Sequence, residues 1–164
     1  MDALSAIAER HSTRSYQNKP IPKRVLEQIV DAGRLAPTAR NEQPWDFVVV
    51  TDQTTKKLIA EFTNYGKFIA EAAACVVVLC RDTFYYIEDG CAATENMLVA
   101  AAGLGVQSCW VAGDKKAYCS EILKILKVPA GHKLVTLVAL GYEKTPVERK
   151  VRRELSDVLH WERF

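Results

Sequence analysis

The chain has 164 residues, of which 49% are hydrophobic and 26% charged, the proportions of an ordinary globular protein. Its 22 basic and 20 acidic residues give a formal net charge of +2, which argues against a nucleic-acid-binding protein and against a polybasic membrane anchor. A single domain over residues 1–164 is expected, because a chain of this length can bury about 70% of its unfolded surface without disulfides or metals.

The first fifty residues predict two helices and a strand. Apolar residues at helical spacing near the N-terminus predict a short helix, whereas the polar run over residues 10–16 is expected to be extended or irregular. A second helix is expected to begin near Pro22 and to stop before Pro37. Aromatic and β-branched residues over residues 45–50 then predict a strand.

Beyond residue 50, helices and strands alternate. A polar turn over residues 51–55 leads into a helix, and a break near residues 64–66 precedes a further helical turn or two. The continuous apolar run over residues 75–80 is typical of a central strand covered on both faces. Residues 86–103 predict a long helix, apolar nearly all round between residues 92 and 102, which should be buried in the protein or at an interface.

The last part of the chain contributes two more strands. The elements expected there are a strand over residues 106–112, a helix over residues 116–126, a strand over residues 134–140 and a charged tail from Glu143. The uncharged run over residues 96–113 is therefore read as a helix end and a strand, not as a membrane span. Because two helices precede the first strand, an α+β sandwich is favoured over a doubly wound fold.

The cysteines number five and include no Cys-x-x-Cys pair: Cys75, Cys80, Cys91, Cys109 and Cys119. Zinc and iron–sulfur sites usually use close pairs, so no metal site is expected. Most of the five lie among apolar residues, as buried free thiols do in a reducing cytoplasm. The N-terminus has no basic start and no uninterrupted apolar run, so we expect no signal peptide and predict a cytoplasmic protein.

The run Arg10-His11-Ser12-Thr13-Arg14 gathers two guanidinium groups, two hydroxyls and an imidazole. On an extended backbone, Arg10, Ser12 and Arg14 point to one side. Such donors suit a phosphate, which accepts several charge-assisted hydrogen bonds. The alternative is a solvated surface turn.

Three further segments leave their roles open. Residues 36–45 hold two prolines and Trp45 directly before a strand, which indicates either a stiff loop of a site or an ordered turn with Trp45 in the core. Residues 148–153 carry four basic residues among six, which indicates a solvated face or a second arm of the same anion site. Gly103-Leu-Gly105 is typical of a helix C-cap, and no Gly-x-Gly-x-x-Gly follows a strand, so no Rossmann site is expected.

Taken in order, these segments resemble the nitroreductase family of FMN-dependent oxidoreductases nearly end to end. Residues 10–14 are similar to the family's opening Arg-x-Ser-x-Arg/Lys element. Residues 36–45 resemble its Ala-Pro-Ser-x-x-Asn-x-Gln-Pro-Trp loop, which is the most specific signal. Residues 103–111 are similar to its Gly-Leu-Gly…Cys-Trp-Ile segment, and residues 141–161 are similar to its C-terminal end.

The resemblance implies an α+β, nitroreductase-like sandwich with a central, mainly antiparallel sheet flanked by helices, and a homodimer with two FMN sites at the subunit interface. The residues that would hold the phosphate and other polar flavin atoms are Arg10, Ser12 and Arg14, with His11 alongside, and Lys150 and Arg152 from the C-terminal side. Those that would line the flavin from the partner subunit are Pro37, Thr38 and Asn41. Those that would lie along the isoalloxazine edge, offering backbone donors near its reactive nitrogen, are Val111, Ala112 and Gly113.

The implied activity is hydride transfer from NADH or NADPH through FMN to an oxidised acceptor, such as a nitroaromatic, a quinone or an activated alkene. The flavin carries the chemistry, so no catalytic side chain is assigned. The alternatives are a specialised family member (a dehalogenase, a dehydrogenase or a flavin-cleaving enzyme), a flavin-binding or redox-sensing module without turnover, and an FMN-free interaction protein.

The chain departs from the family pattern at three points. Many larger members place an Asn and a Lys at the pyrimidine end of the flavin, and here the corresponding stretch over residues 66–70 offers only Lys67. Arg14 is the candidate cation that would favour a reduced, anionic flavin. Ala112 stands where some members have a Glu, and the chain has no room for the insertions that shape larger pockets. The acceptor and the choice of NADH or NADPH stay open.

Overall fold

The centre of the protein is a four-stranded antiparallel sheet. The computed structural model describes residues 1–148 and 150–164, so Arg149 of the basic run lies outside the described residues. The strands are β1 (Trp45–Val50), β2 (Ala74–Arg81), β3 (Gln107–Ala112) and β4 (His132–Gly141). Their order is β1-β2-β4-β3, so that β2 and β4 are central and β1 and β3 form the two edges.

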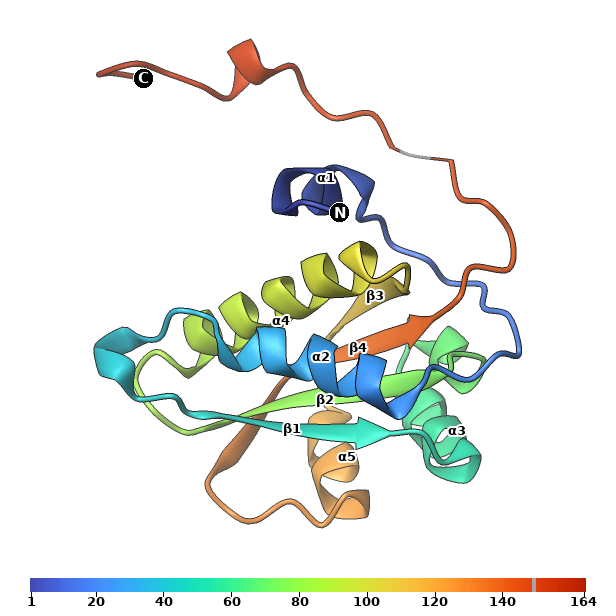
Figure 1. Ribbon diagram of the computed structural model, residues 1–164. Helices are drawn as coiled ribbons and strands as arrows, with labels where there is room; N and C mark the ends of the chain where they lie inside the picture. Colours follow the sequence, from blue (N-terminus) through green and yellow to red (C-terminus); the bar gives the residue numbers. More distant parts are fainter. Residues whose placement is uncertain (149) are drawn as a thin grey trace.

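Both faces of the sheet are covered by helices (Figure 1). Odd-numbered residues from 75 to 79 of β2 pack with α3 (Gln53–Phe62), the 3₁₀ turn η2 (Lys67–Ala70) and α5 (Cys119–Ile125). Even-numbered residues from 76 to 80 pack with α2 (Lys23–Arg34) and α4 (Tyr86–Gly103). This alternation explains why β2 reads as an unbroken apolar run, and it confirms the α+β sandwich.

The N-terminal helix α1 (Ala3–Glu9) contacts α4 outside the two main layers. The predicted bounds of α4 are confirmed, and its sheet-facing residues are buried, whereas Ala92, Val99 and Ala100 are half-buried. Among the described residues, no helix is sufficiently long and apolar to cross a bilayer. The uncharged run over residues 96–113 is divided between α4 and β3.

Two predicted helix starts are wrong, each for a local reason. Asp52 caps α3 by accepting a hydrogen bond from the Thr55 N–H at 2.7 Å, so the helix begins at Gln53 and the polar turn is shorter than expected. The helix expected over residues 116–126 begins only at Cys119, because the residues before it form tight turns: the Lys116 N–H donates to the Gly113 carbonyl at 3.0 Å and the Cys119 N–H to the Lys116 carbonyl at 3.1 Å.

All five cysteines are free, and Cys75, Cys80 and Cys109 are buried. Burial raises the pKa of both the Cys75 and Cys80 thiols to about 12. These two thiols are therefore protonated near neutral pH and poor nucleophiles.

The C-terminal tail runs past α1 without returning to the sheet (Figure 1). Its described residues from Lys144 onward are exposed, and its regular structure is the short 3₁₀ turn η3 (Leu155–Asp157). Several of these exposed side chains are large and apolar, including Trp161, which is 78% exposed. A single chain therefore leaves apolar tail surface in water.

Candidate functional site

A pocket of about 170 Å³ joins the two basic runs of the sequence. Its lining residues are Arg10, His11, Ser12, Arg14, Val147, Glu148, Lys150 and Arg152. Four of these side chains are cationic and one is a carboxylate. The two runs lie far apart in sequence, and Lys150 and Arg152 of the second run line this pocket together with Arg10 and Arg14 of the first. We call this pocket the basic pocket.

The segment before α2 is extended, as predicted, because it pairs with the sheet. Ser12 forms a parallel bridge with Ser108 of β3, and the Thr13 N–H donates to the Ser108 carbonyl at 3.0 Å. Tyr16 is buried and its hydroxyl donates to the Thr13 carbonyl at 2.7 Å. Burial raises the pKa of Tyr16, so this hydroxyl stays a donor. These bonds hold Arg10, Ser12 and Arg14 along one wall of the basic pocket.

Glu143 fixes the opposite side of the same segment. Its Oε1 accepts a hydrogen bond from the Thr13 hydroxyl at 2.9 Å and lies 3.0 Å from His11 Nε2. Partial burial raises the pKa of Glu143, but the hydrogen bonds from His11 and Thr13 outweigh that effect and lower it overall. The other ring nitrogen of His11 lies 3.0 Å from the Glu9 carbonyl. His11 therefore braces the segment, although it also lines the pocket.

A second pocket, of about 470 Å³, adjoins the basic pocket and shares Arg14 with it. Its lining residues are Arg14, Asn64, Tyr65, Phe68, Cys109, Trp110, Val111, Ala112, Lys116 and Tyr118. Four of them are aromatic, and the Arg14 guanidinium lies 6.0 Å from the centre of the Phe68 ring. Aromatic walls suit a flat ring system. We call this pocket the ring pocket.

The end of β3 contributes backbone as well as side chains to the ring pocket. The Ser108 carbonyl points outward to Thr13, so the alternation of an antiparallel strand turns the backbone groups of Trp110 and Ala112 to the same outer edge. Gly113 follows in close contact with Leu134 and Val135, where a Cβ atom would overlap them. Val111 and Ala112 line the ring pocket, and Gly113 follows directly after them.

Lys67, the candidate for the pyrimidine end of the flavin, does not line the ring pocket. Its Nζ donates to the Glu61 carbonyl at 2.9 Å, whereas Asn64, three residues earlier, lines the ring pocket. In the sequence, the predicted helix break near residues 64–66 was the feature that pointed to Asn64. Glu143 had no comparable signal, because it stood among other charged residues at the start of the tail.

The loop that carries Pro37, Thr38 and Asn41 lies away from the basic pocket within one protomer. It enters β1 beside the end of β2, where Arg81 pairs with His132 at the start of β4. The basic pocket lies instead near Leu140, which pairs with Ser108, about 27 Å further along β4. In Figure 1 this loop and the extended segment that follows α1 lie at opposite ends of the sheet. One protomer does not bring these residues to the other predicted site residues.

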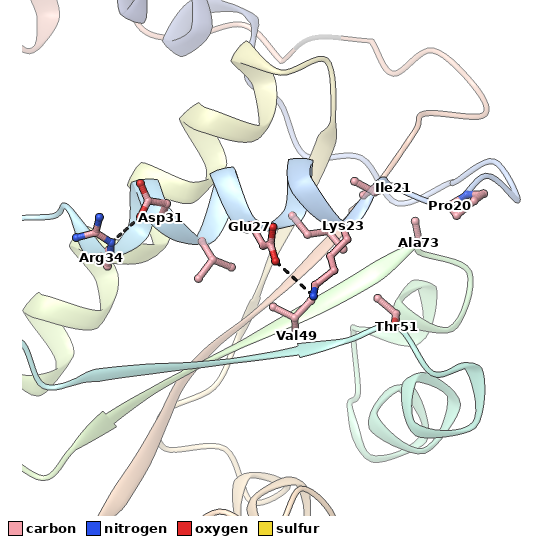
Figure 2. Close-up of a pocket in the computed structure, with 11 residues that line it drawn as sticks. Pro20, Ile21, Lys23, Glu27, Asp31, Arg34, Val49, Thr51 and Ala73 are labelled. Atoms are coloured by element: carbon pink, nitrogen blue, oxygen red, sulfur yellow. Dashed lines mark hydrogen bonds and ion pairs between the residues drawn. The ribbon is translucent and has the colours of Figure 1, made fainter.

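A third cavity, of about 770 Å³, lies between α2 and the edge strand β1 (Figure 2). Its walls include Leu26, Val30 and Val49. Two ion pairs stand at its rim: Lys23 with Glu27 at 3.6 Å, and Arg34 with Asp31 at 2.5 Å. These charges neutralise each other, and none of the predicted site residues lines the cavity. It is an apolar groove and a poor anion site.

The protein has an α+β fold in which a pocket lined by four cationic side chains adjoins a pocket lined by four aromatic ones. The model of the Nitroreductase family matches residues 7–83 and 63–142. A protein of Archaeoglobus fulgidus named "Putative NADH dehydrogenase/NAD(P)H nitroreductase" is 34% identical over 151 residues, covering 87% of this chain and 86% of that protein. The chain belongs to the nitroreductase family.

Solved structures agree with this assignment. The crystal structure of a protein of the same name from Bacteroides thetaiotaomicron matches with a TM-score of 0.92 and 28% identity. The match covers 99% of this chain and 98% of that chain. An FMN-dependent nitroreductase from Clostridium difficile has a TM-score of 0.86 and 25% identity, with 98% and 99% covered. The predicted nitroreductase-like fold is thus confirmed.

Proposed function

We propose that this protein is an FMN-dependent oxidoreductase that transfers a hydride from NADH or NADPH through bound FMN to an oxidised acceptor, such as a nitroaromatic, a quinone or an activated alkene. The observation that carries the proposal is the junction of the basic pocket and the ring pocket at Arg14. FMN has the matching parts, a phosphate and a flat ring system joined by a short chain. FMN-bound or FMN-dependent relatives support the same cofactor.

The basic pocket has the donors that an FMN phosphate requires. Arg10, Arg14, Lys150 and Arg152 supply four positive charges, and Ser12 supplies a hydroxyl. A phosphate of this kind carries close to two negative charges near neutral pH. Charge-assisted hydrogen bonds to it are stronger than neutral ones, so this pocket would provide most of the polar contribution to cofactor binding.

The ring pocket would position the isoalloxazine. Phe68 and Trp110 offer apolar surface, the end of β3 offers backbone donors, and Arg14 with Asn64 offers polar groups for the pyrimidine end. A cation there favours a reduced, anionic ring. When bound, FMN supplies the hydride chemistry itself. The chain's own residues bind, orient and exclude water, which accounts for the lack of an assigned catalytic side chain.

The stoichiometry is simple for a nitroaromatic acceptor. One NAD(P)H and one proton reduce the nitro group to a nitroso group, and one oxygen leaves as water. The hydride, which carries both electrons, comes from the nicotinamide, and the additional proton comes from solvent. Arg14 and Asn64 need only hold the ring system while the donor and then the acceptor occupy the same side of it.

We also propose that the protein works as a homodimer. The loop with Pro37, Thr38 and Asn41 lies at the end of the sheet away from the basic pocket, so a second copy would have to supply it to the flavin. The extended tail from Glu143 to Phe164 can reach about 70 Å, and it carries exposed apolar side chains. The apolar groove between α2 and β1 of a second copy is a surface that this tail could cover.

Anaerobic spectroscopy of the purified protein tests the proposed function. We expect flavin absorption bands, bleaching of those bands by NADH or NADPH, and their return when a nitroaromatic or quinone is added. A passive flavin-binding module would keep its colour when NAD(P)H is added, and an FMN-free interaction protein would show no flavin bands. Either of those two results contradicts the proposal.

A further inference from the structure

Building on the proposed function, we propose that the preferred acceptor is an aromatic or quinonoid ring that carries an anionic group, such as a carboxylate or sulfonate. Lys116, which lines the ring pocket, would be the residue that selects it. The charge of the pocket, the turn that holds Lys116 and the aromatic residues around it carry this inference.

The ring pocket is positively charged. Its described lining includes two cations, Arg14 and Lys116, and no carboxylate. Arg14 also lines the basic pocket, where a phosphate would share it. Asp114, two residues before Lys116, accepts a hydrogen bond from the Tyr86 hydroxyl at 2.8 Å and so is engaged on the α4 side. Lys116 is therefore the cation left for a second ligand.

The turn after β3 holds Lys116 close to the ring pocket. The Lys116 N–H donates to the Gly113 carbonyl at 3.0 Å, and the Lys116 carbonyl accepts from the Cys119 N–H at 3.1 Å. The Cys119 thiol also donates to the Gly113 carbonyl, at 3.0 Å. These bonds place the Lys116 backbone beside the end of β3, where the reactive edge of the isoalloxazine would lie under the proposed function.

Aromatic side chains surround the place that such an acceptor would occupy. Tyr65 is 89% exposed and lines the ring pocket together with Tyr118, whose hydroxyl donates to the Ala112 carbonyl. A planar ring could stack on these side chains while an anionic substituent meets the Lys116 ammonium. Neutral ring acceptors would keep the stacking but lose the charge interaction.

The nicotinamide donor is also an anion, so the test must examine the acceptor alone. The flavin of the holoenzyme is first photoreduced without NAD(P)H, and its reoxidation is then followed by stopped flow. The two acceptors are 4-nitrobenzoate and 4-nitrobenzamide, which have similar shapes and differ in charge. The readout is the ratio of their second-order reoxidation constants, measured at low and at high salt.

We expect the wild-type ratio to favour nitrobenzoate and to fall at high salt, because salt screens an exposed ion pair. Lys116→Glu should lower the ratio by about tenfold, and Lys116→Ala by about threefold. The effect should appear in the acceptor's apparent dissociation constant and not in the limiting rate. Lys115→Glu is the matched control, since Lys115 is the adjacent exposed lysine outside the described lining of the pocket, and its ratio should equal that of the wild type.

A ratio that is the same in Lys116→Glu, Lys115→Glu and the wild type overturns this inference and leaves the proposed function intact. A ratio that falls equally in both glutamate variants also overturns it, because a general surface charge would then explain the preference. Reoxidation by neither acceptor overturns the inference together with the proposed reduction of nitroaromatics.

Discussion

Glu143 shows how one side chain can determine the shape of a site that it does not line. Its carboxylate binds Thr13 and His11, the two residues that alternate with Arg10, Ser12 and Arg14. The three pocket-facing residues are therefore held by contacts on the opposite side of the strand-like segment. Their alternation was predictable from the sequence. The role of Glu143 was not predictable, because its partners His11 and Thr13 lie 132 and 130 residues away in the sequence.

Replacing Glu143 by Gln should destabilise the protein by about 1 kcal/mol at pH 7, because hydrogen bonds to a charged group are lost. The folded pKa of Glu143 lies below its usual value of 4.5, so its stabilising contribution is present above pH 4.5 and is lost as the pH falls through the folded pKa. The difference between wild type and Glu143→Gln in urea unfolding should therefore shrink in acid.

Glu154→Gln serves as the control, because Glu154 is exposed on the tail and should show no such difference. A Glu143→Gln effect that stays constant from pH 7 to below pH 4 would rule out the charge of Glu143 as its cause.

At the scale of elements, α4 supports the loop that carries Thr38. Asp89, in its first turn, is buried and accepts hydrogen bonds from the Thr38 hydroxyl at 2.9 Å and the Ala39 N–H at 3.1 Å. The Thr38 oxygen in turn accepts from the Gln43 N–H at 3.2 Å. The loop needs this support, because Arg40, Asn41 and Gln43 all adopt left-handed backbone conformations.

Asp89→Asn should cost about 1–3 kcal/mol of unfolding free energy, because the amide must turn its NH₂ group toward either the Thr38 hydroxyl or the Ala39 N–H. If this loop lines the flavin of a second copy, FMN affinity should fall as well. Urea unfolding and an FMN titration measure the two effects. Glu88→Gln, on the exposed neighbour, should change neither, and an Asp89→Asn protein as stable as the wild type would show that the hydrogen bonds do not support the loop.

Strong local patterns predicted the elements well. The strand predicted from the aromatic and β-branched run over residues 45–50 and the long helix predicted over residues 86–103 matched β1 and α4 with the same bounds. Patterns failed where local hydrogen bonds decided the boundary, as in the turns that precede Cys119. In the site, both basic runs were visible in the sequence, but their meeting was not, since it depends on the path of the chain after β4.

At the scale of the whole molecule, a single chain does not explain why the tail exposes so many apolar side chains. Its large apolar side chains are exposed, and at about 25 cal/mol per Å² their burial would contribute substantially to association. Removal of residues 154–164 should therefore convert a dimer into a monomer in light scattering. The deletion leaves Lys150 and Arg152 in place, so a weakened FMN site would then be due to the lost partner and not to lost phosphate ligands.

A point variant refines this prediction. Trp161→Ala should weaken the dimer, whereas Arg163→Ala, close by on the same tail, should affect it little. A deletion variant that stays dimeric with an unchanged dissociation constant would mean that the tail is not part of the subunit interface.

The central claim is that two basic runs, far apart in sequence, hold the phosphate of one FMN. Titration of the flavin-free protein with FMN tests it most directly. Arg10→Ala combined with Arg152→Ala should raise the dissociation constant by about a hundredfold, whereas Arg24→Ala with Lys124→Ala, which removes the same charge from exposed helix positions, should leave it near the wild-type value. Equal FMN affinity in both double variants would contradict the account.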